Sequence, residues 1–157
     1  MGMLTEKFGL VLGLAPAADR FNTSPYTDIV SLKNAEAVSF IVVHDGGTTG
    51  VGSLLATACD NVSASNTAAV AGYYRKKTTG ASATWGDVTS FPTTGVLTTA
   101  GESTIFEIMI RAADLPDGKP FVRLQTAESV NDPVNGCVIA ILHGAKYQGL
   151  TQPDYLS

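Results

Sequence analysis

The stretch STIFEIMIR, residues 103–111, decides the fold. In an extended chain Phe106, Ile108 and Ile110 point to one side, while Glu107 and Arg111 point to the other. Alternation of this kind predicts a β-strand that turns one face toward a core.

Runs with the same character lie on both sides of this segment. Residues 121–128 alternate again after the tight turn at Asp117-Gly118, and residues 137–144, CVIAILHG, are apolar on both faces, which predicts a central strand. Further strand patterns precede them, at residues 36–44, 53–60 and 68–77. With two weaker runs this makes about eight strands and no amphipathic helix longer than a turn or two. We therefore expect an all-β protein, a single antiparallel β-sandwich or jelly roll.

The beginning of the chain has a different pattern. The segment EKFGLVLGLAPAADRF, residues 6–21, has an apolar centre followed by charge. A secretory signal needs a basic start and an apolar run of about 7–15 residues, but Glu6 offsets Lys7, and the run from Phe8 to Ala15 is short and interrupted by glycine. We therefore expect an extended arm that a partner covers. The predicted organisation is an N-terminal arm at residues 1–20, a β-sandwich at 21–149 and a C-terminal tail at 150–157.

Composition excludes two classes of partner. The 157 residues fit one domain, and only 15% are charged, against about 25% in ordinary soluble domains. A net charge of −4 and a pI near 5.0 do not suit a protein that neutralises phosphates. The cluster Arg75-Lys76-Lys77 fits a solvated strand end, and no run approaches the roughly 20 apolar residues of a membrane span. We expect neither nucleic acid nor a membrane as a partner.

The sequence contains no pattern that predicts a cofactor or a metal. Residues 47–53 resemble a phosphate-binding loop, but the lysine that would reach the phosphates is absent and the run leads into a strand instead of a helix. The two histidines, His44 and His143, stand singly at strand ends, whereas a zinc site needs three or four ligands. The two cysteines, Cys59 and Cys137, lie in apolar runs and favour buried free thiols over a disulfide.

No arrangement of catalytic residues stands out either. The chain lacks a G-x-S-x-G nucleophile motif, and its carboxylates are scattered, mostly in turns, so no acid–base pair is singled out. The single tryptophan, Trp85, lies in a loop, where capping the edge of a core is a more common role than stacking on a sugar. We expect a protein that is not an enzyme and that binds no cofactor.

Several segments resemble those of a known group of proteins. They are DIVSLKNAEAVSFIV, ACDN, YYRK, TTAGESTIFEI, ADLPDGKPFVRLQ and NDPVNGCVIAILHGAKYQG. Together, over roughly residues 21–149, they resemble small virion proteins encoded among the head genes of tailed bacteriophages and prophages. Members with an assigned role are similar to capsid decoration, or cement, proteins. These are β-sandwich or jelly-roll modules that sit on the outside of the icosahedral shell and clamp neighbouring major capsid subunits.

The resemblance implies a structural protein on the capsid surface of the virion, made in the bacterial host cytoplasm. Its partners would be the major capsid protein and further copies of the chain, as a trimer or a dimer. An arm that orders on binding can wrap a large surface, and its apolar side chains are the natural anchors. The expected contact residues are Phe8, Leu10, Val11, Leu12 and Leu14, followed by Arg20, Phe21 and Tyr26. Deletion of residues 1–20 is expected to abolish shell binding and to leave a folded domain.

Two alternatives remain open. The first is another structural role in the same virion, as a tail-tube or head–tail joining subunit, which a much lower copy number would distinguish. The second is a carbohydrate-binding β-sandwich module, which predicts an exposed Trp85 and affinity for a glycan.

Overall fold

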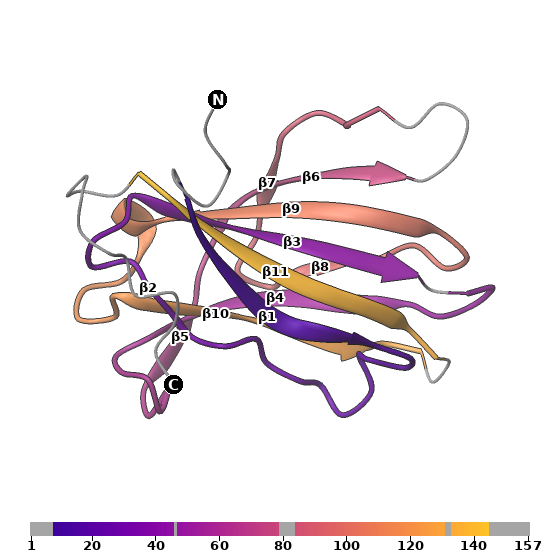
Figure 1. Cartoon of the computed structure of the whole chain (residues 1–157), viewed down its shortest axis with the longest axis horizontal. Coiled ribbons are helices and arrows are strands. Elements are labelled where there is room, and N and C mark those ends of the chain that lie inside the picture. The colour runs from indigo at the N-terminus through magenta and orange to yellow at the C-terminus, as the bar shows by residue number, and fades with distance from the viewer. Residues whose placement is uncertain (1–7, 46, 79–83, 131–132, 145–157) are drawn as a thin grey trace.

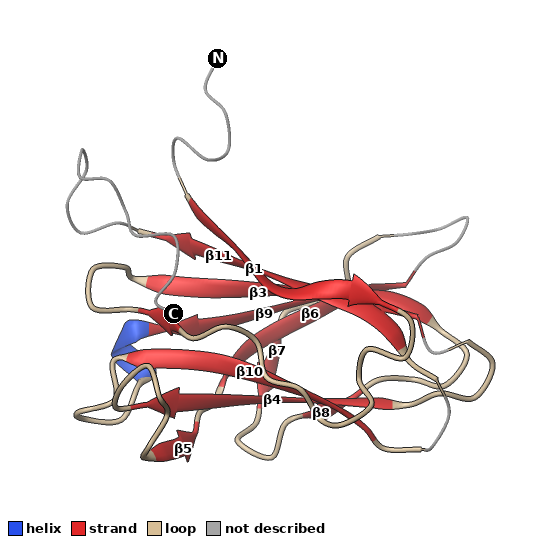
Figure 2. Cartoon of the chain, turned by 60° about the horizontal axis from the view of Figure 1, so that its bottom comes forward, coloured by secondary structure: helices blue, strands red, loops and turns tan. Residues whose placement is uncertain are grey.

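The computed structural model describes residues 8–45, 47–78, 84–130 and 133–144, and these form a β-sandwich of two antiparallel sheets. Figure 2 shows the two layers stacked face to face. The predicted all-β, antiparallel sandwich is therefore confirmed. The predicted C-terminal tail, residues 150–157, lies outside the described residues.

The larger sheet has six strands and carries the surface described below (Figure 1). In spatial order its strands are β1 (Gly9–Ala17), β11 (Asn135–His143), β3 (Ala37–Asp45), β9 (Ser103–Arg111), β6 (Gly72–Thr78) and β7 (Thr89–Phe91). The second sheet has the order β2 (Val30–Ser31), β10 (Phe121–Glu128), β4 (Gly52–Cys59) and β5 (Thr67–Ala69), and β8 (Val96–Leu97) also pairs with β4. One turn of 3₁₀-helix, Ala112–Asp114, follows β9 where a helical turn would be expected before Pro116.

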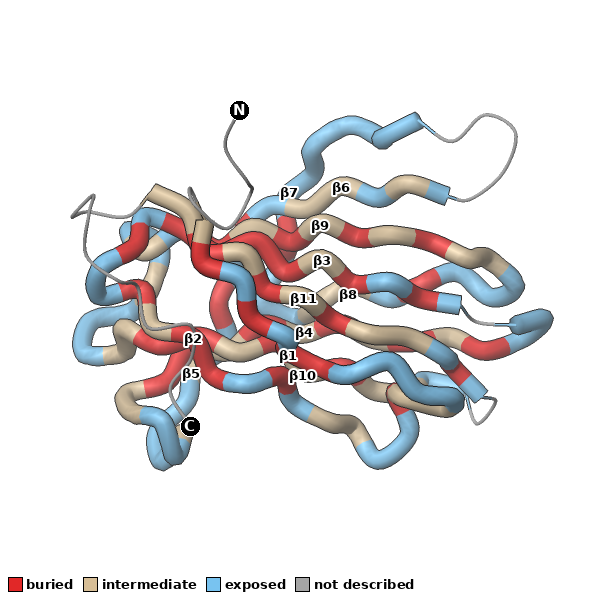
Figure 3. The backbone as a smooth tube through the Cα atoms, in the orientation of Figure 1, coloured by how far each residue is buried: buried red, intermediate tan, exposed pale blue. Residues whose placement is uncertain are grey.

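The alternating patterns place the core between the sheets. The side chains of Phe106, Ile108 and Ile110 on β9 are buried, as are those of Val122 and Leu124 on β10. All of them belong to one apolar cluster that includes residues of both sheets. Figure 3 shows the result as alternating buried and half-buried positions along most of β9 and β11. The orientation predicted for residues 103–111 and 121–128 is confirmed.

The segment predicted as one strand at residues 68–77 is in fact two strands in different sheets. Thr67–Ala69 pairs with β4, and Gly72–Thr78 pairs with β9. The chain crosses between the layers at Val70, whose N–H donates to the carbonyl of Ala56 over 3.1 Å. At Gly72 a Cβ atom would meet the carbonyl oxygen of Met109 and lie 2.6 Å from Ile110 Cδ1, so only glycine permits this close approach.

The predicted N-terminal arm is wrong for the part of it that the structure describes. Residues 9–17 form β1, which pairs antiparallel with β11 from Gly9 opposite Leu142 to Ala17 opposite Gly136. Val11 and Leu14 are buried in the common core, and the ring of Phe8 contacts that of His143 at 6.3 Å between centroids. The segment is held by its own sheet because alternate apolar side chains face the core. Residues 1–7 lie outside the described residues.

Candidate interaction surface

The outer face of the six-stranded sheet carries many apolar side chains. Directly opposed residues share a face of a sheet, and the pairing places three rows of side chains across it. One row runs Leu10, Ile141, Ser39, Met109 and Tyr73; the next runs Leu12, Ile139, Ile41, Glu107 and Arg75; the third runs Cys137, Val43, Ile105 and Lys77.

We call the apolar members of these rows on β1, β11, β3 and β9 the apolar face. It consists of Leu10, Leu12, Ile41, Val43, Ile105, Met109, Cys137, Ile139 and Ile141. Leu10, Leu12 and Val43 are 39%, 57% and 40% exposed, and the other members are half-buried. The outer face of a sheet in a two-layer sandwich is ordinarily polar, because it meets water. Here the central strands are apolar on both sides.

Polar groups border the apolar face and are engaged with one another. Arg75 forms an ion pair with Glu107, its Nη2 2.6 Å from Oε2. At one end, Ser39 Oγ lies 3.1 Å from His143 Nε2. The charges of Arg75 and Glu107 therefore offset each other, whereas Lys77 at the end of the third row forms no ion pair with the described residues. Within these rows, the part from β1 to β3 contains no Asp, Glu, Lys or Arg side chain.

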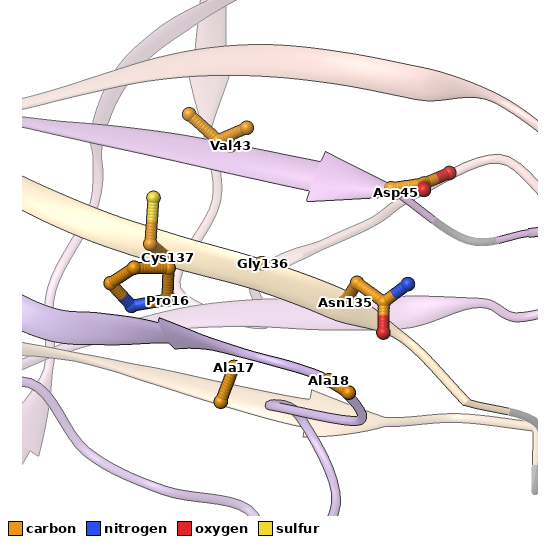
Figure 4. A pocket seen from close by; sticks show the side chains of 8 residues that line it. All are labelled: Pro16, Ala17, Ala18, Val43, Asp45, Asn135, Gly136 and Cys137. Atoms are coloured by element: carbon orange, nitrogen blue, oxygen red, sulfur yellow. The ribbon is translucent and has the colours of Figure 1, made fainter.

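A shallow groove of about 510 Å³ lies at the end of the apolar face where β1 and β3 end and β11 begins (Figure 4). Val43 and Cys137 line its apolar side, together with Pro16, and Asp45 and Asn135 line its polar end. Cys59 and Cys137 are both free thiols. Cys59 is buried, which raises its pKa, whereas Cys137 is half-buried at this groove, so the expectation of a buried thiol is wrong for Cys137.

Two exposed aromatic rings flank the far side of the sheet, on and beside β6. Trp85 is 39% exposed and Tyr73 is 38% exposed. The guanidinium of Arg75 lies over the Trp85 ring at 4.6 Å, and that of Arg111 lies over the Tyr73 ring at 5.2 Å. One face of each ring is thus occupied by a cation.

The structure does not bring the eight expected contact residues together. Val11, Leu14 and Phe21 are buried in the core, so they cannot contact a partner in the folded chain. Leu10 and Leu12 belong to the apolar face, and Phe8 lies half-buried against His143.

The remaining two expected contacts lie elsewhere. Tyr26 is 42% exposed but belongs to the other sheet, where it bridges to Gln125 and lies under the guanidinium of Arg123 at 3.7 Å. Arg20 is half-buried in the turn after β1, and its Nε has no hydrogen-bond partner among the described residues.

Sequence reasoning missed most of the apolar face. The signal was present, because Ile105 and Met109 flank Glu107 on the side of β9 that turns away from the core. The runs around Ile41 and Ile139 are apolar on both sides, which predicts a central strand buried on both faces. In this two-layer sandwich the second face has no covering layer among the described residues, so it forms a surface.

The described parts of the chain contain neither a metal-binding cluster nor a membrane-spanning helix. No group of three or more His, Cys, Asp or Glu side chains there is arranged to hold a metal ion. No helix in the same residues is both long enough and apolar enough to span a membrane.

Comparisons with known proteins leave the family open. No protein-family profile matches the chain, and no curated protein sequence matches it. Among solved structures, it is similar to the CBM22-1–GH10 modules of the Clostridium thermocellum endo-1,4-β-D-xylanase 10B, a structure solved with xylohexaose. The TM-score is 0.43 at 9% identity, and the match covers 94% of this chain and 28% of that one.

Proposed function

We propose that this chain is a structural virion protein that binds the outside of a phage capsid shell and clamps neighbouring major capsid subunits. The apolar face is the observation that carries the proposal. Leu12 is 57% exposed and Val43 is 40% exposed at the surface of a sheet whose neighbouring positions are also apolar. Contiguous exposed apolar surface of this kind marks a site for another macromolecule.

The size of the apolar face suits a contact that acts in many copies. Strands β1, β11, β3 and β9 each have nine residues. The apolar face takes only a five-residue span of each strand, such as Ile105–Met109, so at about 3.3 Å per residue and about 4.8 Å between strands it covers roughly 300 Å². A stable interface uses about 800 Å² per partner. A single copy would therefore bind weakly. A symmetric shell that holds many linked copies would raise the overall affinity.

The proposed contact residues differ from those expected from the sequence. Leu10, Leu12, Ile41 and Val43 would meet the shell, and the Arg75–Glu107 pair would lie at the border. The proposed partners are the major capsid protein and further copies of the chain, with neither nucleic acid nor a membrane.

Shells that lack the protein provide the test. Purified chain is mixed with them, and the pellet after sedimentation is assayed for bound protein and for survival on heating. We expect the wild type to saturate at a fixed ratio to the major capsid subunit and to protect the shells. Val43→Lys is expected to bind at least about tenfold more weakly, because a charge would be buried without a partner.

A matched control is Leu97→Lys, since Leu97 is 65% exposed on β8 of the other sheet. It should bind as the wild type does. Equal binding by Val43→Lys would exclude the apolar face as the contact. A wild-type chain that stays in the supernatant would exclude decoration and leave the tail-tube or joining role and the carbohydrate-binding role.

The carbohydrate-binding alternative has one observation in its favour. The exposed Trp85 and Tyr73 lie near a hollow of about 200 Å³ lined by Tyr73, Arg75 and Val88 among others. A sugar could stack only on the ring faces that Arg75 and Arg111 leave open. A glycan array probed with the wild type and with Trp85→Ala separates this role from decoration.

A further inference from the structure

The sandwich has one long edge strand, β1. Within the described residues, the other strands at the edges of the two sheets, β7, β2, β5 and β8, have only two or three residues each. β1 has nine. Short edges offer few free backbone groups to another chain, whereas a long edge presents a row of unpaired N–H and C=O groups.

Only the second half of β1 is protected against pairing with another strand. The Gly13 carbonyl accepts a hydrogen bond from the Asp28 N–H over 3.2 Å, the register with β11 shifts on both sides of Leu14, and Pro16 lacks an N–H. From Gly9 to Leu12 the pairing with β11 is regular. On the side of these four residues that faces away from β11, none of the described residues forms a strand. The four residues contain no lysine, proline or bulge.

The chemistry of this open edge suits a second copy of the same strand. From Phe8 to Ala18 the sequence contains no charged residue. Two copies paired antiparallel would therefore set no like charges opposite each other, which is the usual obstacle to self-pairing. Leu10 and Leu12, both exposed on the outer side, would pack against the same residues of the second copy.

We propose that two copies of this chain associate through antiparallel pairing of their β1 strands over residues 8–12, centred on Leu10, so that directly opposed side chains share one face of the joined sheet. The two-fold axis passes between the strands and stands perpendicular to the sheet, as a self-complementary contact requires. Two six-stranded sheets then join into one continuous sheet. Both apolar faces lie on the same side of it, with Leu10 and Leu12 at the centre.

The proposal does not depend on shell binding, because the contact is made at the edge of the sheet and can be measured on the protein alone. Size-exclusion chromatography with light scattering over a dilution series gives the mass. We expect twice the chain mass of 16.3 kDa for the wild type. The double variant Leu10→Lys/Leu12→Lys should shift to the single-chain mass at every concentration, since lysines on an edge oppose strand pairing.

Val43→Lys is the matched control, because Val43 lies on the same outer face but on the interior strand β3. It should keep twice the chain mass. Circular dichroism confirms that each variant is folded, as expected for substitutions at exposed positions. The Leu10→Glu/Leu12→Glu variant should also be a single chain, and an equal mixture of the lysine and glutamate variants should recover the double mass.

Three results would overturn the proposal. The first is a wild type with the single-chain mass, or with three times that mass, throughout the dilution series. The second is loss of the double mass in Val43→Lys, which would indicate pairing through the apolar faces. The third is a mixture of the lysine and glutamate variants that remains at the single-chain mass.

Discussion

At the scale of single residues, His44 is a neutral side chain enclosed by the core. It is 1% exposed, its Nε2 lies 2.9 Å from Thr98 Oγ1, and that oxygen accepts the Gly52 N–H over 2.7 Å. Thr98 therefore links the His44 ring to the backbone of β4. Burial lowers the pKa of His44 from its ordinary 6.5, and a backbone contact at Glu102 and the Asp45 and Glu102 carboxylates oppose this only in part.

We expect the free energy of unfolding to fall as the pH drops below 6.5. In that range the unfolded chain takes up a proton at His44 and the folded chain does not, so the unfolded state gains up to about 1.4 kcal/mol per pH unit. Urea unfolding at a series of pH values measures this slope. His44→Gln should flatten it. A slope that is unchanged in His44→Gln would contradict the assignment.

At the scale of elements, Phe21 fixes the end of β1 to the rest of the sandwich. Its ring is fully buried and contacts the His44 ring at 5.8 Å between centroids. It also fills the space beside two glycines: an added Cβ would lie 2.6 Å from the ring at Gly52 and 3.1 Å from it at Gly136. From the turn that follows β1, this one side chain therefore contacts strands β3, β4 and β11.

Phe21→Ala is expected to lower the free energy of unfolding by about 3–5 kcal/mol, the usual cost of removing a buried phenylalanine. Tyr26→Ala, five residues further along at an exposed site, should cost less than about 1 kcal/mol. Urea titration of both variants makes the comparison. Similar losses in the two variants would show that the Phe21 contacts are not the ones that hold β1.

The sequence predicts a strand well when the pattern that identifies it lies within the strand's own residues. The strands β9 and β10 follow from alternation alone, with bounds that match residues 103–111 and 121–128. For β1 the pattern is apolar on both sides and interrupted by glycine, and its partner is β11, at the opposite end of the sequence. Nothing near Leu12 in the sequence indicates that partner. The break between β5 and β6 was missed because the chain changes sheets at Val70 without a proline or an Asp-Gly turn.

At the scale of the whole molecule, one core unites the segments that the sequence separated into an arm and a domain. The same apolar cluster contains Val11 of β1, Phe106 of β9 and Leu124 of β10. The contact surface could not be predicted in the same way, because it arises only when strands distant in the sequence align their outward-facing residues. Ile139, Ile41 and Val43 become neighbours through pairing, and no motif links them.

We expect this shared core to unfold in one step. Far-ultraviolet circular dichroism reports the strands, and near-ultraviolet circular dichroism reports the packed rings, including the stacked Tyr74 and Phe106. The two thermal transitions should coincide. Deletion of residues 1–20 should move both to lower temperature, because Val11 and Leu14 leave the core. Separate transitions in the wild type would indicate that β1 forms an independent unit.

The pairing of β1 with β11 also has a mechanical consequence. Because the strands are antiparallel, Gly9 lies opposite Leu142, so the start of one strand and the end of the other lie side by side. Tension applied between these two points would open the hydrogen bonds between β1 and β11 one pair at a time. Tension along the strands of β3 and β9 would load all of their hydrogen bonds together. The proposed clamp would therefore resist best when the load enters along β3 and β9 and not between Gly9 and Leu142.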